Sequence, residues 1–522
     1  MGRDRGGHGH YAGCGFPAPA RRHHRCARWE PYSLSDPLRL SQLAQILGAA
    51  DLLVETFGTD DPVVLGVCQD SRAIRQGDLF VAWKGVHTDA HAFVPDAVAA
   101  GAVAVVVEVA VAGASIPQLV VSDGRTGGAL VANAVLGDPS RDLFLIAVTG
   151  TNGKTTTALL TRHLLTPHGS AAAIGTLGLV GPEGAARSGT DGLTTPGPVQ
   201  LASWIRDLAD EGVRSLALEA SSHALAQLRL DALRFDVAVF TNLTQDHLDF
   251  HENLEEYFRA KARLVELLEA DGTLVLNQDD RSWDRISWGG HTVTFALGRE
   301  ADVCAVDLEM GAVGSTFRLV TAEGAARVEL PLLGRFNVEN ALAAAAAALT
   351  LGISFTDVVT GLAEAPQVPG RLERVTTEPV PVLIDFAHTP DALAGVLDTL
   401  RPLVGGRLVV VFGAGGDRDR TKRSPMAEAV ARVADLAIVT SDNPRTEDPE
   451  CILDDLEPGL RGSSYERIVD RRTAIARALE IARPGDMILL AGKGHETYQV
   501  VGTERQPFDE RLVVRELLQG AA

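Results

Sequence analysis

The stretch Leu143-Phe144-Leu145-Ile146-Ala147-Val148-Thr149-Gly150-Thr151-Asn152-Gly153-Lys154-Thr155-Thr156 decides the fold class of this chain. Its first six residues are an apolar run typical of a buried strand, and a helical stretch follows through Leu165. Between them, Gly150 and Gly153 let the backbone curl so that successive N–H groups face a phosphate, at the positive end of the helix dipole. The segment therefore predicts a phosphate-binding loop between a strand and a helix.

The loop has the residues that nucleotide chemistry requires. Lys154 would reach the β- and γ-phosphates, and the Thr155 hydroxyl would ligate Mg²⁺. Val148 stands where the usual Walker spacing has its first glycine, so the loop is shorter than that pattern. An ordinary strand–helix turn is the alternative, and Gly-Lys-Thr-Thr at the start of a helix disfavours it. The residues that we expect to bind ATP here are Gly150, Thr151, Asn152, Gly153, Lys154, Thr155 and Thr156.

The rest of the chain alternates short apolar strands with helices. Its 522 residues suggest about three domains. Alternation from residue 143 to about 368 predicts a parallel sheet with helices on both faces. Smaller α/β patterns precede and follow it. The strands that we expect in these regions and in the central one lie at 78–82, 273–276, 382–384, 408–412, 436–439 and 487–490. We also expect a helix at 97–100 that ends at Gly101, and a tightly packed alanine-rich helix at 341–349. We predict an α/β protein with a tail at 1–32, an N-terminal domain at 33–142, a central domain at 143–369 and a C-terminal domain at 370–522.

Composition excludes several classes of protein. The net charge of −20 argues against a nucleic-acid or anionic membrane surface. The five cysteines are scattered without a CxxC pair, which is typical of reduced cytosolic proteins. No apolar run is long enough to span a bilayer, and the Arg-, His- and Gly-rich start has no apolar core of a signal peptide. We expect a cytoplasmic protein with neither a nucleic-acid nor a membrane partner.

Two polar residues follow predicted central strands. Glu219 ends the run Leu216–Leu218, and His247 lies shortly after Val237–Phe240. Open α/β sheets place their chemistry at the carboxyl ends of such strands, where a carboxylate and an imidazole can ligate a cation. Taken alone, each residue is more often a solvated strand end or a loop side chain.

Lys261 falls within an apolar helical stripe. We predict a helix from about Leu254 to Ala270, whose apolar positions at helical spacing lie on the same face as this lysine. An ammonium group there is costly unless it is paired. Snorkelling of the side chain to solvent is the alternative.

Several ordered blocks together resemble the Mur ligases, over roughly residues 67–499. Besides the loop and Lys261, they are Glu219-Ala220-Ser221-Ser222-His223, Thr241 to His251, Leu333 to Asn340, Pro369 to Glu373, Asp385 to Pro390, Asp442 to Arg445 and Gly492 to Glu496. The resemblance implies a small N-terminal α/β domain, a central P-loop ATPase domain and a C-terminal Rossmann-like domain.

The resemblance also implies a reaction. ATP would phosphorylate the D-Glu γ-carboxylate of UDP-N-acetylmuramoyl-L-Ala-D-Glu, and a diamino acid would attack the acyl phosphate, in peptidoglycan biosynthesis. Lys154, Glu219, His247 and Lys261 would be catalytic. Lys261 would be carbamylated, and the Mg²⁺ ligands would be Thr155, Glu219, His247 and Lys261. We expect a monomer.

Further roles follow from the resemblance at matching positions. The UDP-muramoyl-dipeptide residues would be Ser71, Val86, His87, Thr88, Thr194, Thr195, Ser221, Gln227 and Arg229. Adenine, phosphate and ribose would be contacted by Asn337, Arg371 and Asp385. The diamino-acid pocket would consist of Arg418, Asp442, Asn443, Pro444, Arg445, Gly492 and Glu496.

The resemblance implies that the tetrapeptide Asp442-Asn443-Pro444-Arg445 lies at the second carboxylate of the diamino acid, so it bears on which amine is used. A guanidinium fork fits the extra carboxylate of meso-diaminopimelate, which L-lysine and L-ornithine lack. These two amines remain the nearest alternatives. A folylpolyglutamate synthetase, a P-loop switch or motor, and a non-enzymatic nucleotide-binding scaffold are more distant ones.

Overall fold

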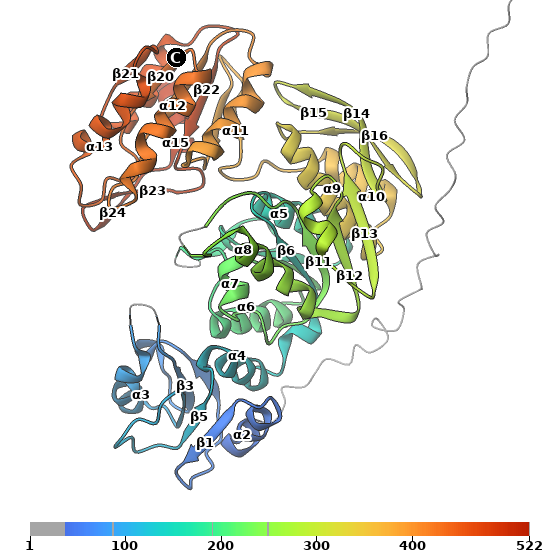
Figure 1. The fold of residues 1–522 in the computed structure, drawn as a ribbon, viewed down its shortest axis with the longest axis vertical. Coiled ribbons are helices and arrows are strands. Elements are labelled where there is room, and N and C mark those ends of the chain that lie inside the picture. The colour runs from blue at the N-terminus through green and yellow to red at the C-terminus, as the bar shows by residue number, and fades with distance from the viewer. Residues whose placement is uncertain (1–36, 86–87, 190–191, 248–249, 521–522) are drawn as a thin grey trace, which may run out of the picture. The chain divides into compact units, whose positions relative to one another are not determined.

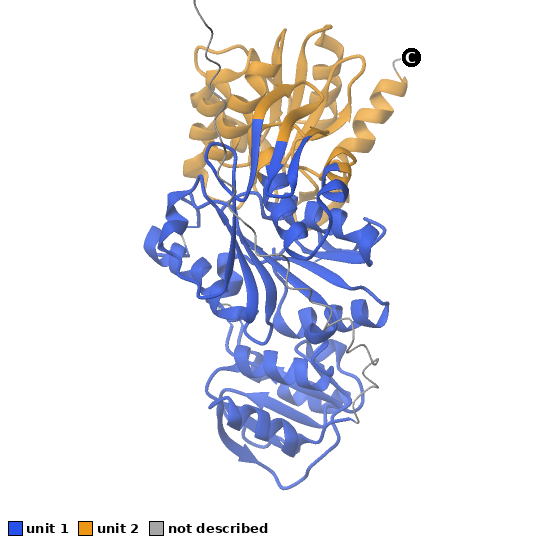
Figure 2. Ribbon diagram, turned by 90° about the vertical axis from the view of Figure 1, so that its right-hand side faces the viewer, with its two compact units in different colours: residues 1–306, 319–326, 340–359 blue, residues 307–318, 327–339, 360–522 orange. Residues whose placement is uncertain are grey.

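The computed structural model describes residues 37–85, 88–189, 192–247 and 250–520. The predicted tail at 1–32 therefore lies outside the described residues. Figure 2 shows two compact units, of which unit 1 comprises residues 1–306, 319–326 and 340–359 and unit 2 the remainder. Within these described residues, three large sheets and one two-stranded ribbon carry the fold, and Figure 1 labels several of their strands. Each predicted α/β domain contains one of the large sheets.

The first sheet, in unit 1, has five strands in the order β1-β5-β4-β3-β2. Strands β2 to β5 pair in parallel, and β1 is antiparallel to β5. The predicted strand at Asp78–Ala82 is confirmed as β3, and the predicted helix ends at Gly101 as expected. The elements are β1 Leu53–Phe57, β2 Gly66–Cys68, β3 Asp78–Ala82, β4 Ala104–Val107, β5 Gln118–Val121, α2 Leu40–Ala49, α3 Val94–Ala100 and α4 Gly124–Val135.

The central sheet has eleven strands in the order β16-β15-β14-β13-β12-β11-β6-β10-β7-β8-β9. The neighbouring strands β13, β12, β11, β6, β10 and β7 all pair in parallel. Strands β8 and β9 add an antiparallel edge, so the sheet is mixed and not wholly parallel as the sequence predicts. Its strands are β6 Phe144–Thr149, β7 Ala171–Gly175, β8 Gly178–Val180, β9 Ala186–Ser188, β10 Ser215–Glu219, β11 Phe235–Phe240, β12 Leu268–Asn277, β13 His291–Ala296, β14 Val303–Gly311, β15 Gly314–Thr321 and β16 Gly324–Leu330.

Strand register brings the predicted site segments to one edge of this sheet. On one side of β6, Glu219 of β10 pairs with Val148. On the other side, Phe240 of β11 pairs with Thr149. Because all three strands are parallel, the loops that follow Thr149, Glu219 and Phe240 leave the sheet side by side. The predicted strands at 143–148, 216–218, 237–240 and 273–276 are confirmed to within a few residues.

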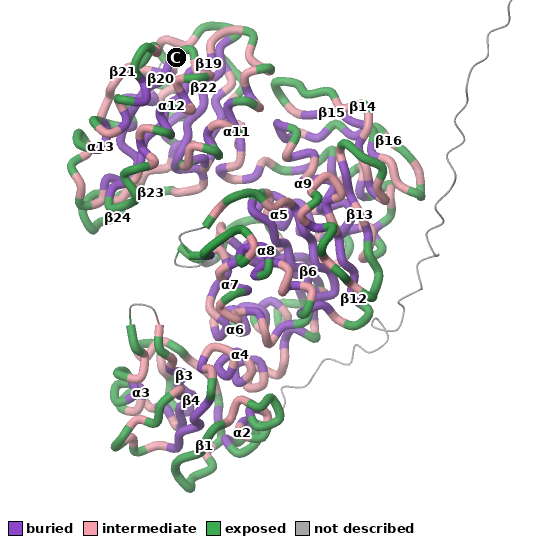
Figure 3. The backbone as a smooth tube through the Cα atoms, viewed as in Figure 1, coloured by how far each residue is buried: buried purple, intermediate pink, exposed green. Residues whose placement is uncertain are grey.

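Helices complete the central region. The alanine-rich run predicted to be a tightly packed helix is confirmed in α9, where Ala341 and Ala343 to Ala348 are fully buried. Figure 3 shows this buried interior in purple. The helices are α5 Lys154–Leu165, α6 Pro198–Asp210, α7 Ser222–Ala226, α8 Leu254–Ala262, α9 Arg335–Thr350 and α10 Phe355–Ala363.

The predicted helix from Leu254 to Ala270 was wrong in its second half. Helix α8 ends at Ala262, a 3₁₀ turn follows at Arg263–Leu267, and Leu268 already begins β12. Leu268 pairs with Phe235 of β11, so strand pairing in the central sheet overrides the helical periodicity. Tyr257, Phe258 and Lys261 are buried as the stripe predicts, whereas Leu254 is exposed.

The third sheet lies in unit 2 and has the order β17-β18-β22-β19-β20-β21. All neighbours are parallel except β17, and the predicted strands at 382–384, 408–412, 436–439 and 487–490 are confirmed. The elements are β17 Glu373–Thr376, β18 Val382–Asp385, β19 Leu408–Phe412, β20 Leu436–Val439, β21 Tyr465–Arg467, β22 Met487–Ala491, the ribbon β23 Tyr498–Val501 and β24 Glu504–Pro507, α11 Pro390–Leu400, α12 Arg423–Val433, α13 Pro449–Leu456, α14 Arg471–Ile481 and α15 Glu510–Gly520.

Among the described residues, none of the helices combines the length and the apolar character needed to cross a lipid bilayer.

Candidate active site

The phosphate loop joins β6 to α5 in unit 1, as the sequence predicts. Gly150 has φ +143° and Gly153, the N-cap of α5, has φ +85°. A Cβ atom added at Gly150 would lie 1.9 Å from Thr241 Oγ1, and one at Gly153 would lie 2.2 Å from Asn340 Oδ1. Both positions therefore require glycine, on steric and on conformational grounds.

The segment after β11 braces this loop. Thr241 Oγ1 donates to the Asn152 carbonyl at 2.6 Å, and Asn242 Oδ1 accepts from the Asn152 N–H at 2.9 Å. The Thr151 N–H donates to the Asn242 carbonyl at 2.7 Å. The buried Tyr257 hydroxyl of α8 donates to Thr151 Oγ1 at 3.2 Å. Burial raises the pKa of Tyr257 to about 12, so this donor stays protonated at neutral pH.

Two lysine amines converge on one backbone carbonyl. Lys154 Nζ donates to the Gly150 carbonyl at 3.0 Å, and Lys261 Nζ donates to the same oxygen at 2.6 Å. Lys261 is 1% exposed, and its amine lies 4.4 Å from the centre of the Tyr257 ring. Burial first, and then the charge of Lys154, hold the pKa of Lys261 well below its usual range. This arrangement favours an uncharged, nucleophilic amine at Lys261.

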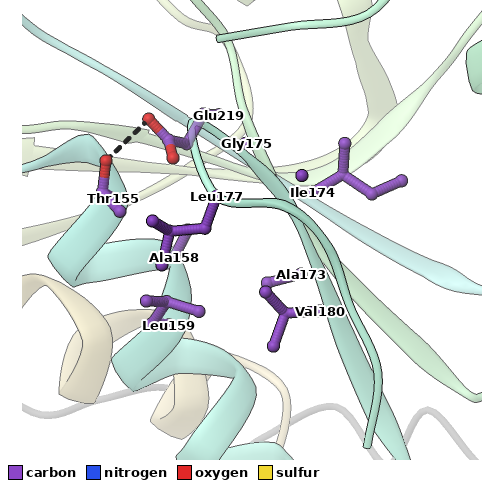
Figure 4. Close-up of a pocket in the computed structure, with 10 residues that line it drawn as sticks. Thr155, Ala158, Leu159, Ala173, Ile174, Gly175, Leu177, Val180 and Glu219 are labelled. Carbon is purple, nitrogen blue, oxygen red and sulfur yellow. Dashed lines mark hydrogen bonds between the residues drawn. The ribbon is translucent and has the colours of Figure 1, made fainter. Parts of the chain in front are cut away.

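Glu219 and Thr155 form the predicted cation-binding pair. Thr155 Oγ1 donates to Glu219 Oε2 at 3.0 Å, and both side chains line a small pocket against β7 and β8 (Figure 4). Glu219 also accepts from the N–H and the hydroxyl of Thr176, at 2.8 and 3.1 Å. Sequence reasoning missed Thr176, because nothing local marks it. Mg²⁺ prefers carboxylate and hydroxyl oxygens as ligands, so this buried pair fits the ion.

His247 lies at the rim of this region. Its φ of +53° is left-handed, and its ring centre is 4.8 Å from that of His223 and 6.3 Å from that of Tyr257. Among the described residues there is no group of three or more His, Cys, Asp or Glu side chains that could hold a metal. The predicted ligand set contains only two residues of those types, so that result does not test it. The set remains a prediction.

Four of the predicted muramoyl-dipeptide residues form one hydrogen-bonded group. Thr195 Oγ1 donates to the Glu219 carbonyl at 2.6 Å and lies 3.1 Å from Ser221 Oγ. Arg229 donates to the Thr195 carbonyl at 2.8 Å and to Gln227 Oε1 at 2.5 and 3.1 Å. Burial, and then the charge of Arg125, lower the pKa of Arg229. The group is thus built on the strand end that carries Glu219.

The remaining residues of that set are less constrained. Thr194 directly precedes Thr195 and is half-buried. Ser71 begins a 3₁₀ turn after β2, and Thr88, whose carbonyl accepts from the Gly85 N–H at 2.9 Å, follows β3. Val86 and His87 lie outside the described residues. Since β2 and β3 are parallel neighbours, Ser71 and Thr88 follow the same edge of the first sheet.

Unit 2 contains the three residues predicted to contact adenine, phosphate and ribose. Asn337 is buried and donates to the Leu333 carbonyl at 2.8 Å. Asp385 accepts from the backbone N–H groups of Leu372 and Ala387, at 2.7 and 2.8 Å, and burial raises its pKa. The Arg371 guanidinium lies 5.0 Å from the centre of the Phe386 ring. The contacts with a nucleotide remain predictions.

The predicted diamino-acid residues gather at the carboxyl edge of the third sheet. Arg445 has a left-handed φ of +51°, and its Nη1 donates to the Gly416 carbonyl at 2.7 Å. A Cβ atom at Gly415 would lie 3.0 Å from Arg445 Nη1 and 3.7 Å from Arg418 Cγ. One at Gly492 would lie 2.5 Å from Asp442 Oδ2. The loops after β19, β20 and β22 therefore meet here, with Pro444 buried between its neighbours.

Asn443 and Glu496 are in direct contact in the same loops. Asn443 Nδ2 donates to Glu496 Oε2 at 2.8 Å, although the two residues are 53 positions apart. Lys493, to which sequence reasoning gave no role, donates to both side chains at 3.1 Å. The only local signal for it is its place between two predicted site residues.

Comparison with known proteins tests the family resemblance. Three family models match: the Mur ligase family catalytic domain at residues 64–128, the Mur ligase middle domain at 148–348, and the Mur ligase glutamate ligase domain at 370–494. Two similar relatives are named UDP-N-acetylmuramoyl-L-alanyl-D-glutamate–2,6-diaminopimelate ligase. The protein from Bacillus velezensis is 41% identical over 88% of this chain and 96% of its own, and that from Gloeobacter violaceus is 43% identical over 89% and 96%.

A solved structure supports the same grouping. It is that of a protein named UDP-N-acetylmuramoyl-L-alanyl-D-glutamate–2,6-diaminopimelate ligase, which is 37% identical to this chain. The match has a TM-score of 0.66 and covers 90% of this chain and 97% of that one. With the phosphate loop, the buried lysine and the three-sheet fold in place, this chain belongs to the Mur ligase family.

Proposed function

We propose that the protein is an ATP-dependent ligase that adds meso-diaminopimelate to the D-Glu γ-carboxylate of UDP-N-acetylmuramoyl-L-Ala-D-Glu in peptidoglycan biosynthesis. The single observation that carries the ligase assignment is the convergence of Lys154 and Lys261 on the Gly150 carbonyl, inside a phosphate loop. The scattered cysteines, which form no CxxC pair, support a cytoplasmic site of action.

The first step requires two anions to meet. The γ-carboxylate attacks the γ-phosphorus of ATP, its oxygen forms the new P–O bond, and ADP leaves. Lys154 supplies positive charge above the loop, and the α5 N terminus adds its dipole. The group of Thr195, Ser221, Gln227 and Arg229, built next to Glu219, would hold the peptide so that its carboxylate faces the loop.

The second step joins the amine. The uncharged amino group of the diamino acid attacks the acyl carbon, the C–N bond forms and the nitrogen loses one proton, and inorganic phosphate leaves as the C–O bond breaks. Thr155, Glu219, His247 and a carbamylated Lys261 would hold Mg²⁺, which offsets phosphate charge when it is bound. The lowered pKa of Lys261 supports carbamylation, because the uncharged amine is the form that adds CO₂.

The identity of the amine substrate is inferred from Arg445 in unit 2. Arg445 uses one N–H on the Gly416 carbonyl, and its other guanidinium N–H groups donate to no described residue. A carboxylate of the substrate is their natural partner, which favours meso-diaminopimelate over L-lysine or L-ornithine. A P-loop switch or motor would give no reason for Arg445 in a loop whose Asn443 contacts Glu496.

The direct test is phosphate release by the purified protein with ATP, Mg²⁺ and UDP-N-acetylmuramoyl-L-Ala-D-Glu. We expect turnover with meso-diaminopimelate and little with L-lysine or L-ornithine. A preference for either of those two would keep the ligase and refute the assigned amine. Phosphate release that needs no amine would point to a hydrolytic switch instead.

The Tyr257 hydroxyl gives a smaller prediction. In Tyr257→Phe the ring under Lys261 remains, but Thr151 loses one hydrogen bond. We expect kcat/KM for ATP to fall roughly fivefold to tenfold, in line with about 1 kcal/mol for such a bond. Tyr498→Phe, on β23 of unit 2, is the matched control and should change this value by less than about twofold. Equal effects of the two substitutions would contradict the prediction.

A further inference from the structure

Lys493 is a fully buried cation in the amine-binding loops of unit 2. Its side chain is at 0% exposure, whereas that of Glu496 is 20% exposed. Burying an ammonium group is unfavourable unless its N–H groups donate hydrogen bonds to nearby acceptors. Within the part of the chain that the structure describes, its side chain donates to Glu496 Oε2 and to Asn443 Oδ1, each at 3.1 Å. The lysine is thus held between two residues of the proposed amine pocket.

The hydrogen bonds at Glu496 are one-sided. Oε2 accepts from Lys493 Nζ and also from Asn443 Nδ2, at 2.8 Å. Oε1 accepts no hydrogen bond from any described residue. Oε2 is therefore held by hydrogen bonds to buried groups, and Oε1 is left to accept from a ligand on the partly exposed side of Glu496.

Asn443 is fixed by the same network. Its Oδ1 accepts from Lys493 Nζ and from the Val500 N–H at 2.9 Å, which sets the orientation of the amide. Its backbone carbonyl accepts from the Gly416 N–H at 2.9 Å, in the loop that also receives Arg445 Nη1. The lysine, the amide and the carboxylate thus tie the loop after β22 to the loops after β19 and β20.

We propose that Lys493 is a positioning residue for the amine substrate: it holds Glu496 so that Oε1 alone faces an ammonium group of the diamino acid. This inference rests on the proposed function. It acts through Glu496 and not through direct contact, since the fully buried Lys493 side chain has no exposed surface to offer a substrate. The carboxylate and the Arg445 guanidinium would then receive opposite charges of one zwitterionic ligand.

The test compares KM values in the phosphate-release assay. In Lys493→Met, which keeps the length and apolar stem, we expect KM for meso-diaminopimelate to rise roughly tenfold to hundredfold. KM for ATP and for the UDP-linked dipeptide should stay within about twofold. Lys493→Gln retains a donor without the charge and should show a smaller rise. Arg407→Met is the matched control, because Arg407 pairs with Asp486 at 2.7 Å at the opposite end of β19 and β22.

A double-mutant cycle separates positioning from a general structural role. If Lys493 acts through Glu496, adding Lys493→Met to Glu496→Gln should leave KM for the amine unchanged. Multiplicative effects, equal rises in all three KM values, or failure of both Lys493 variants to fold would overturn the inference. If the wild type prefers another amine, the same comparison is made with that amine. Absence of wild-type turnover with every amine would overturn the proposed function, and this inference with it.

Discussion

Lys261→Met is expected to lower ligase turnover by roughly a thousandfold while making the protein more stable. Loss of activity follows from removal of the proposed anionic Mg²⁺ ligand, since effects on the order of 10²–10³ are typical of preorganised electrostatic groups. The gain in stability follows from burial, because the Lys261 side chain is desolvated beside the Lys154 charge.

The sign of the stability change depends on pH. The folded-state pKa of Lys261 lies below the unfolded value of about 10.4, so the unfolded chain binds more protons between the two values. Wild-type stability should therefore rise with pH through that window, and Lys261→Met should remove this rise. The advantage of the variant should be largest near neutral pH and vanish towards pH ~10.4.

Thermal unfolding in CO₂-depleted buffer and phosphate release measure the two effects. Arg259→Met is the matched control, because Arg259 is an exposed cation on the same helix, paired with Glu255 and Glu256. Carbon-13 NMR with labelled bicarbonate should show a carbamate signal in the wild type that the variant lacks. Retention of activity within about tenfold would refute the proposed role, and a fall in stability near pH 7 would refute the burial argument.

Arg445→Ala is expected to reduce kcat/KM for meso-diaminopimelate on the order of a hundredfold. Loss of one partner of a hydrogen-bonded charge pair costs about 3 kcal/mol. Weak turnover with L-lysine should change by less than about threefold, because L-lysine has no second carboxylate that Arg445 could bind. The ratio between the two amines is therefore the quantity to measure.

Backbone strain at Arg445 needs its own control. Its φ of +51° is left-handed, so alanine there adds a conformational cost that asparagine tolerates better. Arg445→Asn should match Arg445→Ala if the guanidinium is what matters. Arg420→Ala, which removes an exposed arginine paired with Asp455 at 2.9 Å, should leave the ratio unchanged. An unchanged ratio in both Arg445 variants would show that another group recognises the second carboxylate.

Much of the fold could be predicted because its strands are continuous apolar runs. Strands β3, β19 and β20 begin and end where the sequence places them. The helix expected through Ala270 was wrong in its second half. Val265 and Leu268 continue the apolar spacing of the helix, but Val265 lies in a 3₁₀ turn and Leu268 begins a strand. The domain boundaries and the roles of the site residues remain predictions.

The sequence by itself determined the glycine-rich loop, the apolar stripe that contains Lys261 and the resemblance that names the chemistry, because glycine spacing, helical periodicity and motif order are local. Only the tertiary structure decided which atoms meet. Thr155 and Glu219 are 64 positions apart, and Gly150 and Lys261 are 111 apart. Their contacts depend on β6 lying between β10 and β11, and the network of Lys493 depends on β22 lying beside β19. Strand order is set by the packing of the whole domain, which no local pattern of residues encodes.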